Sequence, residues 1–180
     1  MHRPLIRCLA LLAMPVAVRT IQEVPMAFTL TSSSFKEGGP IPAKHTCDGA
    51  DASPPLAWSG APAGAAGFAL IMDDPDAPGG TWVHWVLYDL SARSSALPEN
   101  VAKTETVKDG TEQGRSDFRR PGYGGPCPPP GKAHRYFFKL YALDAPLGLK
   151  PGATKQEVER AMQGHVLATA QLMGTYGRQK

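Results

Sequence analysis

Glycine and proline interrupt this chain so often that few long helices fit into it. The sequence holds 19 glycines and 18 prolines among 180 residues, and they separate short apolar runs. Proline removes a backbone donor and glycine weakens a helix interior, so this pattern predicts short strands joined by tight loops. Hydrophobic residues make up 42% of the chain, enough for one core. The length is that of a single domain, which we expect to span residues 26–180.

Three segments have the residue pattern of strands. Residues 67–72 are an apolar run between a glycine and an Asp-Asp-Pro sequence, which predicts a buried strand. Residues 82–90 are rich in aromatic and β-branched residues, which predicts a strand covered on both faces. In residues 135–143 one face of the expected strand carries Tyr136, Phe138, Leu140 and Ala142, while Arg135 and Lys139 share the other face. His134 has the same parity as this apolar row, so we expect it at the rim of the core.

The last thirty residues have helical signals. Thr154 and Glu157 form a capping-box sequence, and helical spacing of apolar residues follows it. A second helical segment is predicted over residues 165–173, ending at Gly174. Strands followed by helices indicate a β-rich domain with a helical tail.

Two proline-rich loops lie just before histidines that open strand patterns. Residues 73–78 read Asp-Asp-Pro-Asp-Ala-Pro and lead to His84, and residues 125–130 read Gly-Pro-Cys-Pro-Pro-Pro and lead to His134. Proline fixes φ, so such loops keep their shape without a sheet ladder. Two rigid loops with histidines at their exits indicate the walls of one small polar pocket.

These two blocks occur with three others, at residues 35–42, 46–49 and 53–58, in an order that resembles the phosphatidylethanolamine-binding protein family. More narrowly, the chain resembles its bacterial branch, often called Raf-kinase-inhibitor-like, over residues 28–177. The resemblance implies a mainly β fold, namely an antiparallel β-sandwich with Greek-key-like connections and a small C-terminal helical segment.

The resemblance also implies a cavity that binds small anions and phosphorylated head groups. Protonated imidazoles and loop amides would supply donors and positive charge, while an aspartate would pair with a histidine and fix its orientation. The second loop carries a cysteine that the animal members lack, which leaves the lip of the cavity and any lipid specificity open. The family's cavity residues can be transferred to the matching positions of this sequence. The ligand-binding residues that the resemblance implies are then Asp74, Asp76, Pro78, Trp82, His84, Gly125, Pro126, His134 and Tyr136.

The function that these features favour is a non-enzymatic binding protein without a cofactor. Its ligand would be a small anionic or phosphorylated molecule. The resemblance also implies a protein partner, namely a kinase or other enzyme that this protein would regulate. One alternative is a metal-dependent hydrolase that uses His84, His134 and Asp74, although no short metal-ligand spacing supports it. Another is a protease or kinase inhibitor that acts through its surface without the pocket. Serine-nucleophile catalysis lacks its Gly-x-Ser-x-Gly sequence.

Cys47 and Cys127 both lie in small glycine- or proline-containing loops of the expected pocket region. They would form a disulfide if the loops touch, but a sequence does not give their Cα separation. Two buried free thiols are the preferred interpretation. No Cys-x-x-Cys pair indicates a structural zinc site.

Residues 1–25 are expected to lie outside the fold. They would be either a degenerate secretion signal or the result of a translation start assigned too far upstream. Positive charge precedes a short apolar run, but a small-x-small cleavage site is missing and the run is too short for a transmembrane helix. We therefore expect a cytoplasmic location, with a periplasmic or secreted one as the alternative. The formal net charge is only +3, and no basic block indicates nucleic-acid binding. The chain would be a monomer or a dimer.

Overall fold

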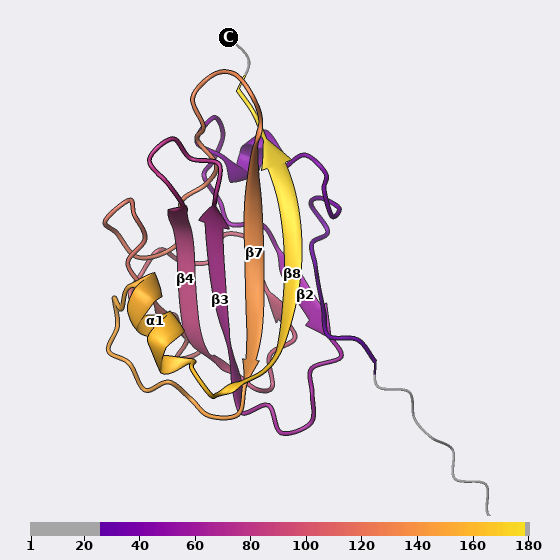
Figure 1. The fold of residues 1–180 in the computed structure, drawn as a ribbon, viewed down its shortest axis with the longest axis vertical. Coiled ribbons are helices and arrows are strands. Elements are labelled where there is room, and N and C mark those ends of the chain that lie inside the picture. Colours follow the sequence, from indigo (N-terminus) through magenta and orange to yellow (C-terminus); the bar gives the residue numbers. More distant parts are fainter. Residues whose placement is uncertain (1–25, 179–180) are drawn as a thin grey trace, which may run out of the picture.

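The computed structural model describes residues 26–178, which form two antiparallel sheets and one short α-helix (Figure 1). The predicted class, a mainly β antiparallel sandwich with a small helix near the C-terminus, is confirmed. The predicted N-terminal extension, residues 1–25, lies outside the described residues. Within residues 26–178, no helix has the length and apolar character that a membrane crossing needs.

The larger sheet has the strand order β6-β4-β3-β7-β8, and the smaller sheet has the order β1-β2-β5. A single-turn 3-10 helix, η1 (Ala43–His45), precedes β2. The strands are β1 (Thr29–Thr31), β2 (Leu56–Ser59), β3 (Gly67–Asp74), β4 (Trp82–Ser91), β5 (Ala96–Leu97), β6 (Glu112–Gln113), β7 (His134–Leu143) and β8 (Val166–Tyr176).

The main core lies between the sheets, and alternation along the strands decides which side chains enter it. On β7, Tyr136 and Phe138 are fully buried, whereas Arg135 lies on the other face and is exposed. Trp58 of β2 and Trp85 of β4 are buried in this core, as the sequence indicated. Strand β3 is buried at every position, because its second face packs against another apolar cluster.

That second cluster lies beneath α1 (Lys155–Ala161), which covers the β4 side of the larger sheet in Figure 1. The predicted capping box is present: the Thr154 side chain accepts from the Glu157 amide, and Glu157 accepts from the Thr154 amide. Lys155 donates to Asp73 of β3 at 2.9 Å, which ties the first turn of the helix to the sheet.

The second predicted helix, residues 165–173 with a cap at Gly174, is wrong. Val166–Tyr176 form strand β8, which pairs with β7 along its whole length. Pairing and burial of alternate side chains in the core override the weak helical spacing of this segment. Gly174 is required for a different reason: a Cβ there would lie 2.6 Å from the Ile41 side chain and 2.8 Å from Phe35.

The antiparallel register brings three strand ends together at one edge of the larger sheet. Strand β3 ends at Asp74, and its neighbours β4 and β7 begin at Trp82 and His134. Asp74 pairs with Trp82, and Asp73 pairs with Phe137. Residues far apart in the chain therefore meet at this end of the sandwich.

Candidate functional site

A small cavity lies where these three strand ends meet. Its volume is about 220 Å³. Strand ends supply Asp74, Trp82, His84, His134 and Tyr136, while the loops around them supply the remaining wall. The residues that line it are Asp74, Ala77, Pro78, Trp82, His84, Phe118, Cys127, Pro128, Pro129, His134 and Tyr136. The structure thus places six of the nine predicted site residues around one space.

His134 is held by Asp74. Its Nδ1 atom donates to Oδ2 of Asp74 at 2.8 Å, and both side chains are almost fully buried. The other carboxylate oxygen, Oδ1, accepts from the amide of Asp76 at 2.8 Å, so the carboxylate itself is fixed. An aspartate that orients a histidine is the role we expected from the residue types, and it leaves Nε2 of His134 as the nitrogen available to a ligand.

His84 is held by the backbone instead. Its Nδ1 atom lies 2.6 Å from the carbonyl oxygen of Gly124. A carbonyl oxygen only accepts, so Nδ1 carries the hydrogen and Nε2 of the neutral ring carries a lone pair. Burial lowers the pKa of His84, although the Gly124 hydrogen bond and the charge of Asp74 oppose this. Burial therefore favours the neutral imidazole of His84 over the protonated form.

Tyr136 lines the same space. The ring packs edge-on against His84, with 5.2 Å between ring centroids. Its hydroxyl is buried and forms no well-formed hydrogen bond within residues 26–178, although the Asp74 carboxylate lies near enough to act as a weak acceptor. Burial raises the pKa of Tyr136 strongly, and the nearby charge of Asp74 adds to this, so the hydroxyl stays protonated. A buried hydroxyl left unpaired is costly unless a ligand or a water meets it.

Asp76, Gly125 and Pro126, which were also predicted as site residues, do not line the cavity. Asp76 accepts two hydrogen bonds from the Arg135 side chain, at 2.9 and 2.8 Å, which lower the pKa of Asp76. Pro126 accepts from the amide of Cys47 at 3.1 Å. These residues fix the loops behind the walls, so their contribution to the site is positional.

Asp51 holds the second loop and was missed from the sequence. Its Oδ1 accepts from the amide of Gly125 at 2.6 Å, and its Oδ2 accepts from Lys103 at 2.6 Å and from Arg120 at 3.1 Å. Burial alone would raise the pKa of Asp51, but these hydrogen bonds lower it. The close approach needs a glycine, because a Cβ on Gly125 would lie 2.5 Å from the carbonyl oxygen of His45.

The preferred interpretation of Cys47 and Cys127 as free thiols is wrong. They form a disulfide with a Cα–Cα distance of 5.4 Å across 80 residues of chain. The loops meet because the Cys47 amide bonds to Pro126 next to Cys127, a long-range contact that local sequence does not indicate. Since Cys127 lines the cavity, the disulfide is part of its wall.

Phe118 lines the cavity but lies outside both loops that the sequence predicted as its walls. Its ring packs edge-on against Trp82 and His84, with centroid distances of 5.6 and 5.4 Å. It comes from a loop without strand or helix periodicity, so only the tertiary structure places it there.

The remaining described histidines have structural contacts away from the cavity. His45 is buried and bonds to Ala52 and Ser34, and His165 pairs with Asp144 on the surface. His2 lies outside the described residues. In residues 26–178, no three histidine, cysteine, aspartate or glutamate side chains are grouped so that they could hold a metal ion.

The fold and the site define a class: a two-sheet β-sandwich with a small cavity at the strand ends, walled by histidines and proline-rich loops. The sequence profile described as phosphatidylethanolamine-binding protein matches residues 31–177. The chain belongs to this family.

Its relatives include two proteins named UPF0098 protein. The protein of Methanothermobacter thermautotrophicus is 51% identical over 149 residues, which cover 83% of this chain and 98% of the relative. That of Aquifex aeolicus is 52% identical over 149 residues, covering 82% of this chain and 86% of the relative.

Two crystal structures are similar as well. A phosphatidylethanolamine-binding protein homologue from Chlamydia trachomatis has a TM-score of 0.78 and 43% identity, over 84% of this chain and 98% of its own. The Escherichia coli protein YbcL, described as a new member of the mammalian family, has a TM-score of 0.78 and 34% identity, over 84% of this chain and 99% of its own.

Proposed function

We propose that this protein is a non-enzymatic binding protein whose cavity accepts a phosphate-like anion or a phosphorylated head group. One observation carries the proposal. Protein partners occupy Nδ1 of both His84 and His134, so both Nε2 atoms remain for a ligand, together with the Tyr136 hydroxyl, which forms no well-formed hydrogen bond in the described residues. Three polar groups in a cavity of only about 220 Å³ suit a small ligand with a polar end.

The lowered pKa of His84 sets a condition on the ligand. A lone pair on Nε2 repels an anion, whereas a protonated Nε2 donates a charge-assisted hydrogen bond to it. Anion binding is therefore coupled to proton uptake at His84, because the bound charge favours the imidazolium form.

Binding is favoured over catalysis by the state of the cavity's reactive groups. Cys127 is bonded to Cys47, so its sulfur is not a thiol nucleophile. Both oxygens of Asp74 accept hydrogen bonds from the protein, one from His134 and one from the Asp76 amide. The alternative of a metal-dependent hydrolase would require Asp74 to exchange these bonds for a metal.

Calorimetric titration with inorganic phosphate, together with histidine NMR resonances, tests the proposal. We expect phosphate to shift the ring signals of His84 and His134, and we expect binding to be lost in His84→Ala and His134→Ala. His165→Ala is the matched control, because His165 also pairs with an aspartate but lies on the surface. Absence of binding to the wild type, or an unchanged affinity in both pocket variants, would overturn the proposal.

A regulatory role toward a kinase or a protease is a separate proposal, supported by the family resemblance alone. Pull-down experiments with the wild type and with the two pocket variants would separate a pocket-dependent partner from one that docks on the surface. Equal capture by all three proteins would favour the surface inhibitor.

The disulfide bears on the location of the protein. Structural disulfides persist in oxidising compartments and are rare in the cytosol of mesophiles, so Cys47–Cys127 supports the periplasmic or secreted alternative over the cytoplasm. Alkylation of free thiols in intact cells, followed by mass spectrometry, would test this. A fully alkylated pair would favour the cytoplasm.

A further inference from the structure

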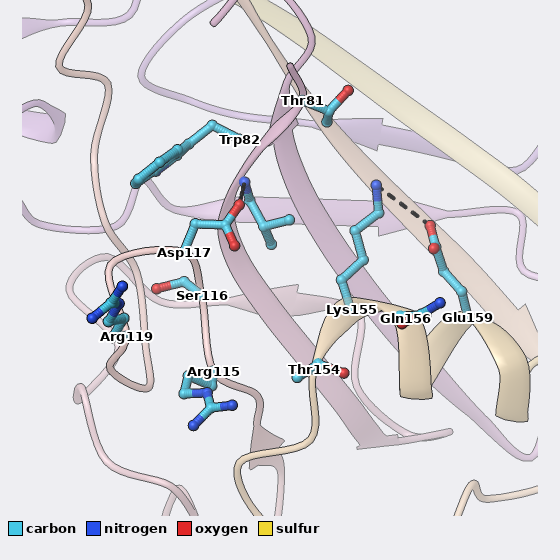
Figure 2. Close-up of a pocket in the computed structure, with 11 residues that line it drawn as sticks. Thr81, Trp82, Arg115, Ser116, Asp117, Arg119, Thr154, Lys155, Gln156 and Glu159 are labelled. Carbon is cyan, nitrogen blue, oxygen red and sulfur yellow. Dashed lines mark hydrogen bonds and ion pairs between the residues drawn. The ribbon is translucent and has the colours of Figure 1, made fainter. Parts of the chain in front are cut away.

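A larger polar groove lies beside the cavity, between the loop of residues 115–119 and the first turns of α1 (Figure 2). Its volume is about 930 Å³, several times that of the cavity. The start of β4 forms its floor, where the amide of Val83 donates to Asp117 at 2.7 Å. The groove is therefore built from three segments that are each fixed by the fold.

Trp82 joins the groove to the cavity. It lines both, and its side chain is one of the few large apolar side chains exposed at the surface, with 40% of the residue accessible. The loop opposite Trp82 also borders both spaces: Phe118 lines the cavity, and its neighbours Asp117 and Arg119 line the groove. The tail of a ligand whose head group occupies the cavity would have to pass Trp82 to reach the groove.

The charges of the groove are not balanced. Lys155 is neutralised, since it pairs with Asp73 at 2.9 Å and with Glu159 at 3.5 Å. Arg115 and Arg119 are both exposed, and within residues 26–178 neither forms an ion pair. The lining contains two carboxylates, Asp117 and Glu159, against these three cations.

Two of the acidic groups near these arginines have other partners, whereas Asp117 keeps its negative charge. Glu159 is paired with Lys155, and one oxygen of Asp117 accepts from the Val83 amide. Glu157, whose charge interacts with Arg115, is held in the capping box. The turn itself is fixed, because the Arg119 amide donates to Ser116 and the Ser116 hydroxyl donates to the carbonyl oxygen of Arg120.

From this geometry we infer that the groove selects ligands with a second acidic group, such as a phosphate monoester whose tail ends in a carboxylate. The inference rests on the proposed function, because the cavity must hold the phosphate. Arg115 and Arg119 attract a carboxylate tail and repel an ammonium tail. Phosphoethanolamine, with its amine, is therefore the weaker ligand of this cavity.

The test compares ligands that share the phosphate and differ in the tail. Inorganic phosphate reports on the cavity alone, phosphoethanolamine carries an amine, and a series from phosphoglycolate to phosphooxyhexanoate carries a carboxylate on spacers of rising length. We expect at least one carboxylate ligand to bind about two- to fivefold more tightly than phosphoethanolamine at low salt, the range of exposed charge pairs. High salt should reduce this preference.

The variants Arg115→Gln and Arg119→Gln, singly and combined, should remove the preference without changing the affinity for inorganic phosphate. Arg115→Lys and Arg119→Lys keep the charge and should retain it. Arg93→Gln is the matched control, because Arg93 is exposed at the opposite end of β4. All these positions lie on the surface, and circular dichroism checks that each variant is folded.

The outcomes separate this inference from the proposed function. If phosphate binds and the preference for a carboxylate tail is absent, or persists in the Arg115→Gln/Arg119→Gln variant, the groove does not select the tail. If phosphate itself does not bind, the proposed function fails and the inference fails with it.

Discussion

Oδ2 of Asp74, the last residue of β3, lies 2.8 Å from Nδ1 of His134, the first residue of β7. The two residues are 60 positions apart in the chain but occupy neighbouring antiparallel strands. The orientation of one wall of the cavity therefore depends on a single buried contact between two strand ends.

Replacing Asp74 with asparagine should weaken both the fold and the site. The loss of the charged acceptor should lower the free energy of unfolding by about 1–3 kcal/mol. The affinity for phosphate should fall about tenfold, which corresponds to about 1.4 kcal/mol, because His134 loses the carboxylate that orients its ring. Denaturant unfolding and calorimetry measure the two effects.

Asp144→Asn is the control for this variant. Asp144 pairs with His165 at the same distance of 2.8 Å, but both side chains are about half exposed, at 45% and 48%. Solvent weakens such a pair, so this substitution should change neither quantity noticeably. Equal effects at the two sites would contradict a special role for Asp74.

Acidification should have opposite effects on stability and on anion affinity through His84. Burial lowers the pKa of His84 below its ordinary value of 6.5, so the unfolded chain binds more protons than the folded protein near that pH. Stability contributed by the neutral ring is therefore present above about pH 6.5 and decreases as the pH falls. A bound anion favours protonation, so anion affinity should rise over the same range.

Sulfate is a suitable probe, since its charge does not change in this range. Titration in buffers with different ionisation enthalpies would measure the proton taken up on binding, and His84→Gln should abolish that uptake. An affinity for sulfate that does not depend on pH would contradict this prediction.

Tyr136→Phe should separate stability from binding. The hydroxyl forms no well-formed hydrogen bond in the described protein, so its removal should leave the free energy of unfolding unchanged or raise it by about 1 kcal/mol. Phosphate affinity should nevertheless fall, because the ligand loses a donor. Thermal unfolding and calorimetry on the same samples measure both.

The comparison variant is Tyr123→Phe, whose hydroxyl donates to the carbonyl oxygen of His45 at 2.6 Å in the buried interior. That substitution should destabilise the protein, since it leaves a buried acceptor unpaired. Destabilisation by Tyr136→Phe of similar size would show that its hydroxyl has a structural partner.

Reduction of the disulfide should destabilise the protein and loosen the cavity. Cys47–Cys127 closes a loop of 80 residues, and loss of such a cross-link costs about 2–4 kcal/mol. Phosphate affinity should fall as well, because Cys127 and Pro128 form part of the wall. Unfolding curves with and without a reductant test this, and the Cys47→Ser/Cys127→Ser variant should not respond to the reductant.

Much of the fold was predictable because the strand signals are local. The alternation in residues 135–143 and the apolar run of residues 67–72 fix both the strands and their buried faces. The capping box at Thr154 was also predictable from the local sequence. Strand β8 was not, because alanine, leucine and glutamine suit a helix, and only its partner β7 decides its conformation.

The candidate site was predictable where its residues lie at strand ends. Asp74, His84 and His134 follow or open strands, so a pattern of strands and loops brings them to one edge. The supporting residues were not predictable in this way. Contacts between loops produce no periodic pattern in the sequence. Such contacts position Asp51, Phe118 and the Cys47–Cys127 disulfide.

The position of Asp51 has a practical consequence for mutational scans. It touches Gly125, Lys103 and Arg120 but does not border the cavity. A deep scan scored by ligand capture would rank Asp51 beside the direct contacts. A parallel abundance readout would distinguish such anchoring positions from those that meet the bound molecule.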